Sequence, residues 1–458
     1  MIFLSKKKYI FIAIIIVVAI VALLVIAYGL KLGVMVNPVT TFSDKSGSQP
    51  NILLIITDDM GLDADPCHTN IGAEKPNMPN LLALCEKGVT FDNVWGTPVC
   101  SPTRANMMSG QYGFRTGVTA VDKILSPNVE SVADVLTNKV PVPYANAFIG
   151  KWHMSGPNPE ANIPSAFGVQ YFAGFLADII HNYFDYDIYE QGVKTHQETY
   201  ATTLFANKAI EWIQGQGQKD PNRPWFMWLA FNAPHKPFHL PPKDLISDKF
   251  LSGSQDDIDK NPRKYYFAAL EAVDKEMGRL FSSITPQQLS NTIVIFIGDN
   301  GTPSEVIQAP FDSNRAKTSV YQGGVGGVLT VAGKGVTREG AHEKALINAT
   351  DIFATISDLA GSTQTKIYDS VSFKQSLTLS NYNGRTFLYT EWEPAKGPKS
   401  DVWAVRDNTY KLMEYSDGTK ELYDLSKDPY ENTNLITSTM STSLQEVVNK
   451  LQGYKEGL

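Results

Sequence analysis

One short segment carries a cysteine, a proline and an arginine at spacings that suit a reactive site. Cys100 is followed by Pro102 and then by Arg104. Proline suits the first turn of a helix, where its missing N–H costs nothing, so we expect a loop that runs into a helix here. Cys100 would lie at the helix N-terminus, where free N–H groups favour negative charge. Arg104, one turn later, would share its face. The segment predicts a nucleophile beside an anion-binding cation.

Two apolar runs in the chain end in acidic or amide side chains. Residues 51–57 and 292–297 each have the pattern of a strand buried on both faces, as in a parallel sheet. Ligands bind beyond the carboxyl ends of such strands. Carboxylate and amide oxygens are the ligands that Ca²⁺ and Mg²⁺ prefer. The residues that follow the two runs therefore predict a divalent metal site: Asp58, Asp59, Asp299 and Asn300.

Two lysines and two histidines follow other predicted strands or lie in loops. Lys151 and His153 are two residues apart, so both project to one side of an extended chain. His235 follows another apolar strand, and Lys317 lies in a glycine-rich segment. Each alone is most simply a loop residue, just as Cys100 alone is most simply a small buried cysteine. Together they predict a pocket in which a metal and cations stabilise an anion while histidines transfer protons.

The segments that must position these residues alternate between strand-like and helix-like patterns. Alternation over about 300 residues predicts an α/β fold with a large mixed, mostly parallel sheet flanked by helices. Strands are expected at 51–57, 145–149, 225–231, 292–297 and 328–332, and helices at 79–87, 131–139, 198–214, 264–284 and 349–360.

Past residue 381 the pattern changes to short strand-like segments joined by turns. This pattern predicts a smaller antiparallel sheet, followed by a final helix near 443–452. We therefore expect a catalytic domain at 51–380 and a smaller C-terminal α+β domain at 381–458. The short strands are expected at 386–391, 402–406, 410–415 and 421–423.

The N-terminus predicts a membrane anchor. Three lysines at 6–8 precede an uncharged run from residue 9 to residue 30, which is long enough to span a bilayer core of about 30 Å. We expect a cytoplasmic stub and one transmembrane helix within 1–36 and a linker at 37–50; a cleaved signal peptide is the alternative. The lysines should stay cytoplasmic, which places the remaining chain in the periplasm, a lumen or the extracellular space.

Composition excludes some classes of protein. A net charge of −7 and a pI near 5.6 give no basic footprint for nucleic acid, so no nucleic-acid partner is expected. Three cysteines are too few for a disulfide scaffold. Cys67 and Cys85 either pair in an oxidising compartment or remain two thiols.

Taken together, these motifs resemble those of the sulfatase family, in particular the arylsulfatase-like members whose active-site cysteine is oxidised to formylglycine. Cys100–Arg104, with Met108-Ser109-Gly110 after it, looks like the modification motif, and 149–153 looks like the second motif. The two acidic pairs match the family's metal positions. The resemblance implies an alkaline phosphatase-like fold, and it extends through two C-terminal segments, 403–411 and 421–435.

The resemblance implies a sulfuric ester hydrolase. Cys100 would become formylglycine, whose hydrate is the nucleophile and also contacts the metal. One hydroxyl would attack sulfur, form a covalent sulfate ester on the enzyme and release the alcohol. His235 and Lys317 would protonate or neutralise the leaving oxygen, and His153 would take a proton from the second hydroxyl to expel sulfate. The remaining cations would hold the hydroxyl pair and the sulfate oxygens: Arg104 and Lys151.

The resemblance also implies a cofactor and partners. Ca²⁺, with Mg²⁺ as the alternative, would be held by the group derived from Cys100 and by three aspartates and one asparagine, called the acidic quartet below: Asp58, Asp59, Asp299 and Asn300. The substrate would be a sulfate monoester of an aryl alcohol or a carbohydrate, and a maturation enzyme would generate formylglycine. The membrane would be a further partner through the N-terminal helix.

Two features leave alternatives open. Many family members place a small hydroxyl residue against the sulfate, and the segment 174–186 has no clear match; its polar candidates are Asp178 and His181. Related hydrolases with the same cysteine motif cleave phosphonate monoesters or phosphodiesters, so this substrate class is the alternative function. A binding protein without catalytic activity is a third hypothesis.

Overall fold

The structure is a computed structural model, and it describes residues 49–177, 180–363, 367–393 and 401–458. These residues belong to one compact unit, Thr40–Leu458. The predicted transmembrane segment and most of the predicted linker lie outside the described residues. Within the described ranges, every helix is too short or too polar to cross a bilayer.

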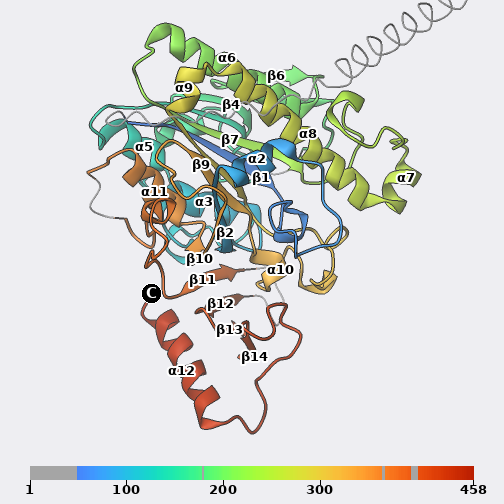
Figure 1. Cartoon of the computed structure of the whole chain (residues 1–458), viewed down its shortest axis with the longest axis vertical. Coiled ribbons are helices and arrows are strands. Elements are labelled where there is room, and N and C mark those ends of the chain that lie inside the picture. Colours follow the sequence, from blue (N-terminus) through green and yellow to red (C-terminus); the bar gives the residue numbers. More distant parts are fainter. Residues whose placement is uncertain (1–48, 178–179, 364–366, 394–400) are drawn as a thin grey trace, which may run out of the picture. The chain divides into compact units, whose positions relative to one another are not determined.

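Ten strands form one mixed sheet in the order β10-β2-β9-β8-β1-β7-β3-β4-β5-β6 (Figure 1). Its centre, from β8 through β1, β7 and β3 to β4, is parallel, while β9, β5 and β6 pair antiparallel with their neighbours. The prediction of a large mixed sheet is confirmed. The strands are β1 (Asn51–Asp58), β2 (Gly88–Trp95), β3 (Ala145–Lys151), β4 (Tyr171–Phe175), β5 (Tyr186–Glu190), β6 (Val193–Gln197), β7 (Trp225–Pro234), β8 (Thr292–Gly298), β9 (Leu329–Gly333) and β10 (Ala341–Asn348).

Helices cover both faces of this sheet because the central strands are apolar on both sides. In β1, Leu53 and Ile55 pack with α2, α6 and α8, whereas Ile52 and Leu54 pack with α3, α5 and α11. All four side chains are fully buried. The α-helices are α2 (Pro79–Glu86), α3 (Cys100–Ser109), α4 (Gly113–Thr116), α5 (Val132–Asn138), α6 (Ala201–Lys219), α7 (Gln255–Lys260), α8 (Pro262–Ser283), α9 (Pro286–Ser290), α10 (Gln322–Val325), α11 (Asp351–Leu359) and α12 (Thr442–Glu456).

Single turns of 3₁₀ helix occur between these elements. They are η1 (Leu62–Ala64), η2 (Ile163–Phe167), η3 (Lys243–Leu245), η4 (Ser313–Arg315) and η5 (Lys374–Leu377). Two of them matter below, because η1 precedes a histidine cluster and η4 precedes Lys317 in the chain.

A second, four-stranded antiparallel sheet follows the first in the chain, as predicted. Its order is β11-β12-β13-β14, and α12 packs against β12 and β13. The division into domains at residue 381 stays a prediction. The strands are β11 (Leu388–Trp392), β12 (Val402–Arg406), β13 (Tyr410–Tyr415) and β14 (Lys420–Asp424).

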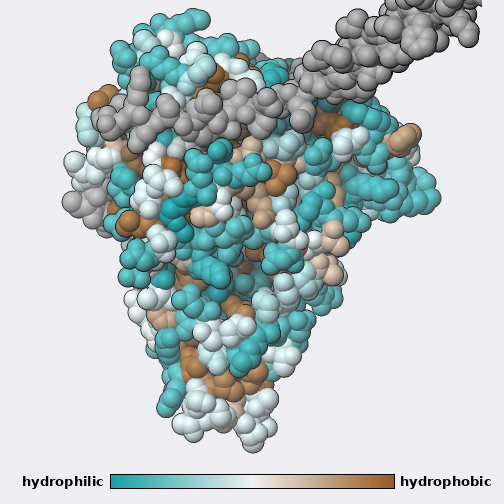
Figure 2. Space-filling view, viewed as in Figure 1, coloured by the Kyte–Doolittle hydropathy of each residue, from teal (hydrophilic) through white to brown (hydrophobic). Residues whose placement is uncertain are grey.

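Two further features concern the surface and the cysteines. The face shown in Figure 2 is mostly hydrophilic, with small hydrophobic patches scattered over it, as is usual for a surface exposed to water. Cys67 and Cys85 form a disulfide, which settles the alternative left open by the sequence. The bond ties the loop after η1 to α2.

Candidate active site

The predicted site residues converge at the carboxyl ends of the parallel strands. β1 ends at Asp58, β8 is followed by Asp299, β3 ends at Lys151 and β7 leads into His235. Neighbouring parallel strands bring these ends to one edge of the sheet. The helix α3 supplies Cys100 and Arg104, and the loop after η4 supplies Lys317.

Cys100 begins helix α3, as the Cys-x-Pro-x-Arg spacing predicted. Its side chain is 3% exposed. The Sγ atom lies 3.2 Å from His153 Nδ1 and 3.4 Å from Lys151 Nζ. Burial raises the pKa of the thiol, and the nearby lysine only partly offsets this effect. The encoded thiol is therefore neutral and a poor nucleophile at neutral pH.

Arg104 lies one turn after Cys100 and is fully buried. Its Nε and Nη2 donate to Asp299 Oδ2 at 3.0 and 2.8 Å, and its Nη1 donates to the Lys151 carbonyl at 2.8 Å. Such charge-assisted bonds are strong and fix geometry. In this structure Arg104 thus holds a predicted metal ligand and the backbone of a predicted catalytic lysine in place.

The four predicted metal ligands form a buried cluster of oxygen atoms. Lys151 Nζ donates to Asp58 Oδ2 at 2.5 Å, and Asn300 Nδ2 donates to Asp59 Oδ1 at 2.7 Å. Asp58 Oδ1 and Asn300 Oδ1 are buried and have no hydrogen-bond partner. Ligand atoms of Asp58, Asp299 and Cys100 lie within 4.8 Å of one another. Since buried oxygens without partners are rare, this set fits a hard divalent cation.

Burial and neighbouring charges shift the pKa values of two carboxyl groups in this cluster in opposite directions. Burial, aided by the neighbouring Asp58, raises the pKa of Asp299 to about 6. Burial also opposes ionisation of Asp58, but Lys151, His235 and Arg104 hold the pKa of Asp58 well below its usual range. Asp58 is therefore a carboxylate at any physiological pH.

Both predicted catalytic histidines are neutral in this environment. Burial, followed by the charge of Lys151, lowers the pKa of His153 well below its ordinary value. His153 has φ 54°, and its Nε2 is buried without a partner. Burial also lowers the pKa of His235, whose Nδ1 donates to the Lys236 carbonyl at 2.6 Å. The Nε2 of His235 therefore carries the lone pair, 3.8 Å from Asp59 Oδ2.

Lys317 joins the cluster on the side of Asp59. Its Nζ lies 2.6 Å from Asp59 Oδ1 and 2.7 Å from Oδ2, and its side chain is 14% exposed. Asp59 itself has φ 77°, a strained backbone for a residue with a side chain. Lys317 and His235 thus share one carboxylate, while Lys151 and His153 lie beside Cys100.

Two glycines allow the strands to deliver these groups. A Cβ on Gly150 would lie 1.9 Å from the Ala230 carbonyl oxygen, and Gly150 has φ 99°. A Cβ on Gly298 would lie 2.2 Å from the Met60 carbonyl oxygen. Each glycine directly precedes a predicted site residue, Lys151 or Asp299. Close approach of the backbone, which only glycine permits, therefore sets both positions.

Some supporting residues were not foreseen from the sequence. Tyr266, on α8, donates its hydroxyl to the Asp59 carbonyl at 2.8 Å. Thr103 accepts from the Thr97 N–H at 2.8 Å and so fixes the loop before α3. The local sequence gives no signal for the role of Tyr266, because its hydrogen-bond partner lies 207 residues away.

The sequence also offered two polar candidates for contact with the sulfate. Asp178 lies outside the described residues, and His181 is exposed.

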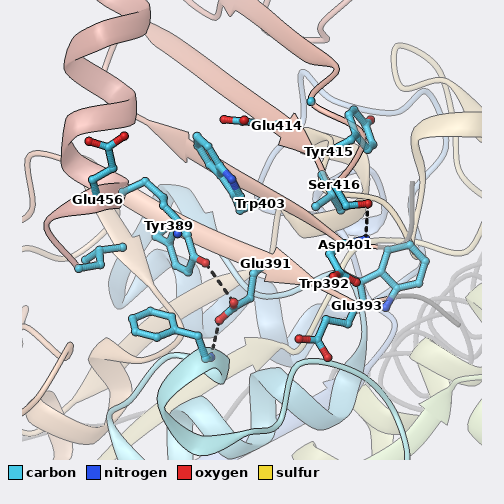
Figure 3. Close-up of a pocket in the computed structure, with 15 residues that line it drawn as sticks. Tyr389, Glu391, Trp392, Glu393, Asp401, Trp403, Glu414, Tyr415, Ser416 and Glu456 are labelled. Atoms are coloured by element: carbon cyan, nitrogen blue, oxygen red, sulfur yellow. Dashed lines mark hydrogen bonds between the residues drawn. The ribbon is translucent and has the colours of Figure 1, made fainter. Parts of the chain in front are cut away.

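A separate pocket lies on the second sheet and contains none of the predicted site residues (Figure 3). It has a volume of about 570 Å³ and an aromatic and acidic lining that includes Trp392, Trp403 and Glu414. Glu391 accepts the Phe114 N–H at 2.7 Å, and burial raises the pKa of this carboxyl to about 7.

The Glu391 carboxyl predicts a pH dependence of stability. Because its pKa is raised on folding, the folded chain binds a proton more tightly than the unfolded chain, so its contribution is present at acidic pH and is lost as pH rises through about 7. We expect Glu391→Gln to flatten the fall in unfolding free energy between pH 5 and 8 by about 2 kcal/mol. Urea denaturation at several pH values measures this. The control, Ser416→Ala in the same pocket, removes no titratable group and should keep the wild-type slope; equal slopes in all three chains would contradict the prediction.

Known proteins are similar to this chain over most of the described residues. A model of the sulfatase family matches residues 50–362, and a model described as N-sulphoglucosamine sulphohydrolase, C-terminal, matches residues 317–456. The uncharacterized sulfatase YdeN of Escherichia coli is 28% identical over 70% of this chain and 64% of its own length. YidJ of the same organism is 23% identical over 55% of this chain and 57% of its own length.

Other relatives match over more of their length. The ulvan-active sulfatase of Formosa agariphila is 25% identical over 88% of this chain and 81% of its own. Among solved structures, Ps i-CgsB has a TM-score of 0.75 at 22% identity and covers 90% of this chain and 92% of its own. BT4656, solved with its substrate D-glucosamine-2-N,6-O-disulfate, has a TM-score of 0.72 at 19% identity and covers 89% and 98%. These two structures support the fold.

Proposed function

Because this chain belongs to the sulfatase family, we propose that it hydrolyses sulfate monoesters at the site around Cys100. The observation that carries the proposal is the buried cluster in which Cys100, Lys151 and His153 lie beside oxygen atoms that fit a divalent cation. The relative named for its activity on ulvan favours a sulfated carbohydrate as the natural substrate class.

Cys100 is proposed to act as formylglycine, because it begins the Cys-x-Pro-x-Arg segment that resembles the modification motif of the family. The hydrated aldehyde supplies a hydroxyl nucleophile in the place of the thiol. His153, neutral and 3.2 Å from Sγ, is the base that takes a proton from that position. Lys151 Nζ, 3.4 Å from Sγ, stabilises negative charge there.

The acidic quartet is proposed to hold Ca²⁺. When bound, the ion supplies positive charge that polarises the sulfate oxygens. Asp58, Asp59, Asp299 and Asn300 would hold it through their carboxylate and amide oxygens, in agreement with the two unpartnered oxygen atoms.

His235 and Lys317 are proposed to interact with the oxygen of the leaving alcohol. Both lie beside Asp59, whereas His153 contacts Cys100. Lys317 stays protonated because Asp59 raises its pKa, although burial opposes this. The lysine can therefore donate to the oxygen that departs from sulfur.

Modification of Cys100 is tested by mass spectrometry. When the chain is expressed with a formylglycine-generating enzyme, we expect the tryptic peptide that contains Cys100 to have lost sulfur and gained oxygen. The rate of aryl sulfate hydrolysis should rise in proportion to the fraction of chains that carry formylglycine. A chain that carries only the thiol and hydrolyses the ester at the same rate would contradict the mechanism, and a strong preference for an aryl phosphonate would favour the alternative substrate class.

The location of the protein outside the cytoplasm also remains a proposal. The Cys67–Cys85 disulfide supports an oxidising compartment. We propose that residues 1–36 anchor the chain with its catalytic part in the periplasm, a lumen or the extracellular space. Fractionation of membranes with and without this segment tests the anchor.

A further inference from the structure

A second cluster of metal-binding side chains lies away from the candidate active site, at the edge of the large sheet. It contains His68 from the loop after η1, Asp92 from β2 and His342 from β10. Strands β2 and β10 lie side by side (Figure 1) and pair in parallel. His342 lies opposite Thr90 in this pairing. One ligand atom from each of the three residues lies within 4.8 Å of the others.

The two imidazole rings of this cluster contact the same oxygen of Asp92. His68 Nε2 lies 3.2 Å from Asp92 Oδ1, and His342 Nδ1 lies 2.7 Å from the same oxygen. Ligand atoms about 2.0–2.2 Å from a tetrahedral metal ion lie about 3.3–3.6 Å apart. The His68–Asp92 distance therefore fits an ion, while the shorter His342–Asp92 contact has to lengthen when the ion binds. His68 is 5% exposed and Asp92 is 26% exposed, while the His342 side chain is 48% exposed. The cluster is therefore anchored on one side and open to solvent on the other.

The buried Asp65 carboxylate fixes the orientation of His68. Its Oδ2 lies 2.7 Å from His68 Nδ1, and its Oδ1 accepts the Cys67 N–H at 3.0 Å. The disulfide between Cys67 and Cys85 ties the same loop to α2. The Nδ1–H of the ring is thus given to a carboxylate and Nε2 is turned toward Asp92. Metal-binding histidines in proteins are oriented by a second-nitrogen bond of this kind.

We propose that His68 Nε2, His342 Nδ1 and an oxygen of Asp92 bind a zinc ion, with water completing its coordination. Two imidazole nitrogens and one carboxylate form a ligand set that zinc favours, unlike the all-oxygen set that Ca²⁺ prefers. The carboxylates of Asp92 and Asp65 balance the two positive charges of the ion. The site joins three segments that are distant in the sequence, so the bound ion stabilises the edge of the sheet and takes no part in ester hydrolysis.

The competing explanation is a purely ionic cluster in which His68 lies between two carboxylates, Asp65 and Asp92. Zinc content and thermal stability separate the two. The full chain is dialysed against Zn²⁺ in saturating Ca²⁺, to keep zinc from the acidic quartet, and bound zinc is counted by elemental analysis and by native mass spectrometry.

We expect one zinc ion per wild-type chain and a rise of about 3 °C in melting temperature at a hundredfold excess of Zn²⁺ over its dissociation constant. His342→Ala and Asp92→Asn should lose both the ion and the shift, and His342→Ala should keep the wild-type rate of ester hydrolysis. The matched control is His196→Ala, which removes an exposed histidine on β6 that contacts Asp185, just before β5, and Asp187 on β5, and this variant should keep the zinc ion.

Two results would overturn the proposal. One is a wild-type chain that holds no zinc under these conditions, which would leave the ionic cluster as the explanation. The other is equal zinc content in the wild-type chain, His342→Ala and Asp92→Asn, which would place the ion elsewhere. Since neither result depends on hydrolysis of an ester, the test is independent of the proposed function.

Discussion

Replacing Cys100 with alanine is expected to lower kcat/KM for a sulfate ester by at least about 10⁴-fold, because the variant has no precursor of the nucleophile. Alanine fits the start of α3, and the cavity left by Sγ is small, so the chain should fold. Initial rates with an aryl sulfate measure the loss.

Binding and a neighbouring variant make this result specific. If the chain is an enzyme, Cys100→Ala should still bind the sulfate ester in calorimetry while turnover is lost. Ser101→Ala is the matched control, since it removes a buried hydroxyl that has no hydrogen-bond partner from the next position. A Cys100→Ala variant with the wild-type rate would exclude the proposed nucleophile and favour another site.

Removing the charge of Asp58 is expected to have the second largest effect. Asp58→Asn keeps the shape of the side chain but leaves the buried Lys151 ammonium without its carboxylate at 2.5 Å. The variant loses a charged ligand of the metal and the ion pair with Lys151, and together these losses should lower kcat/KM by about 10³-fold at low Ca²⁺. The unfolding free energy should fall by about 3–5 kcal/mol, because a buried charge remains unpaired.

Titration with Ca²⁺ distinguishes a metal ligand from a residue that only supports the fold. Wild-type activity should vanish on dialysis against a chelator and return with Ca²⁺, while Asp58→Asn should need far more Ca²⁺. Asp256→Asn is the control, since this exposed carboxylate pairs with Lys260 in a helix. Identical Ca²⁺ titration curves for the wild-type chain and Asp58→Asn would refute the assignment of Asp58 as a ligand.

The central strands were predictable because their burial on both faces appears as an unbroken apolar run. The run at 51–57 corresponds to β1 and the run at 292–297 to β8, each within one residue. The polar residues that follow them were therefore placed at the correct edge of the sheet. Site residues that directly follow such strands are readable from the sequence for this reason.

Strands at the edges were not predictable in the same way. β10 contains exposed polar residues, including His342, and β2 contains Asp92, so neither is a continuous apolar run. The hairpin β5–β6 was also missed. Its turn has positive φ at Gln191 and Gly192, and the glycine is the one sign of this turn in the sequence. The histidine cluster depends on pairing between β2 and β10, and no local spacing encodes that contact.

The two glycines that precede Lys151 and Asp299 bear on any screen of random variants. A selection for turnover should return Gly150 and Gly298 unchanged as often as the residues that contact the ester, because a single methyl group at either position collides with a carbonyl oxygen. Intolerance to mutation would then mark these positions as essential although neither has a side chain to offer the reaction. A map of intolerant positions in this chain would outline the tight crossings of its backbone as clearly as its chemistry.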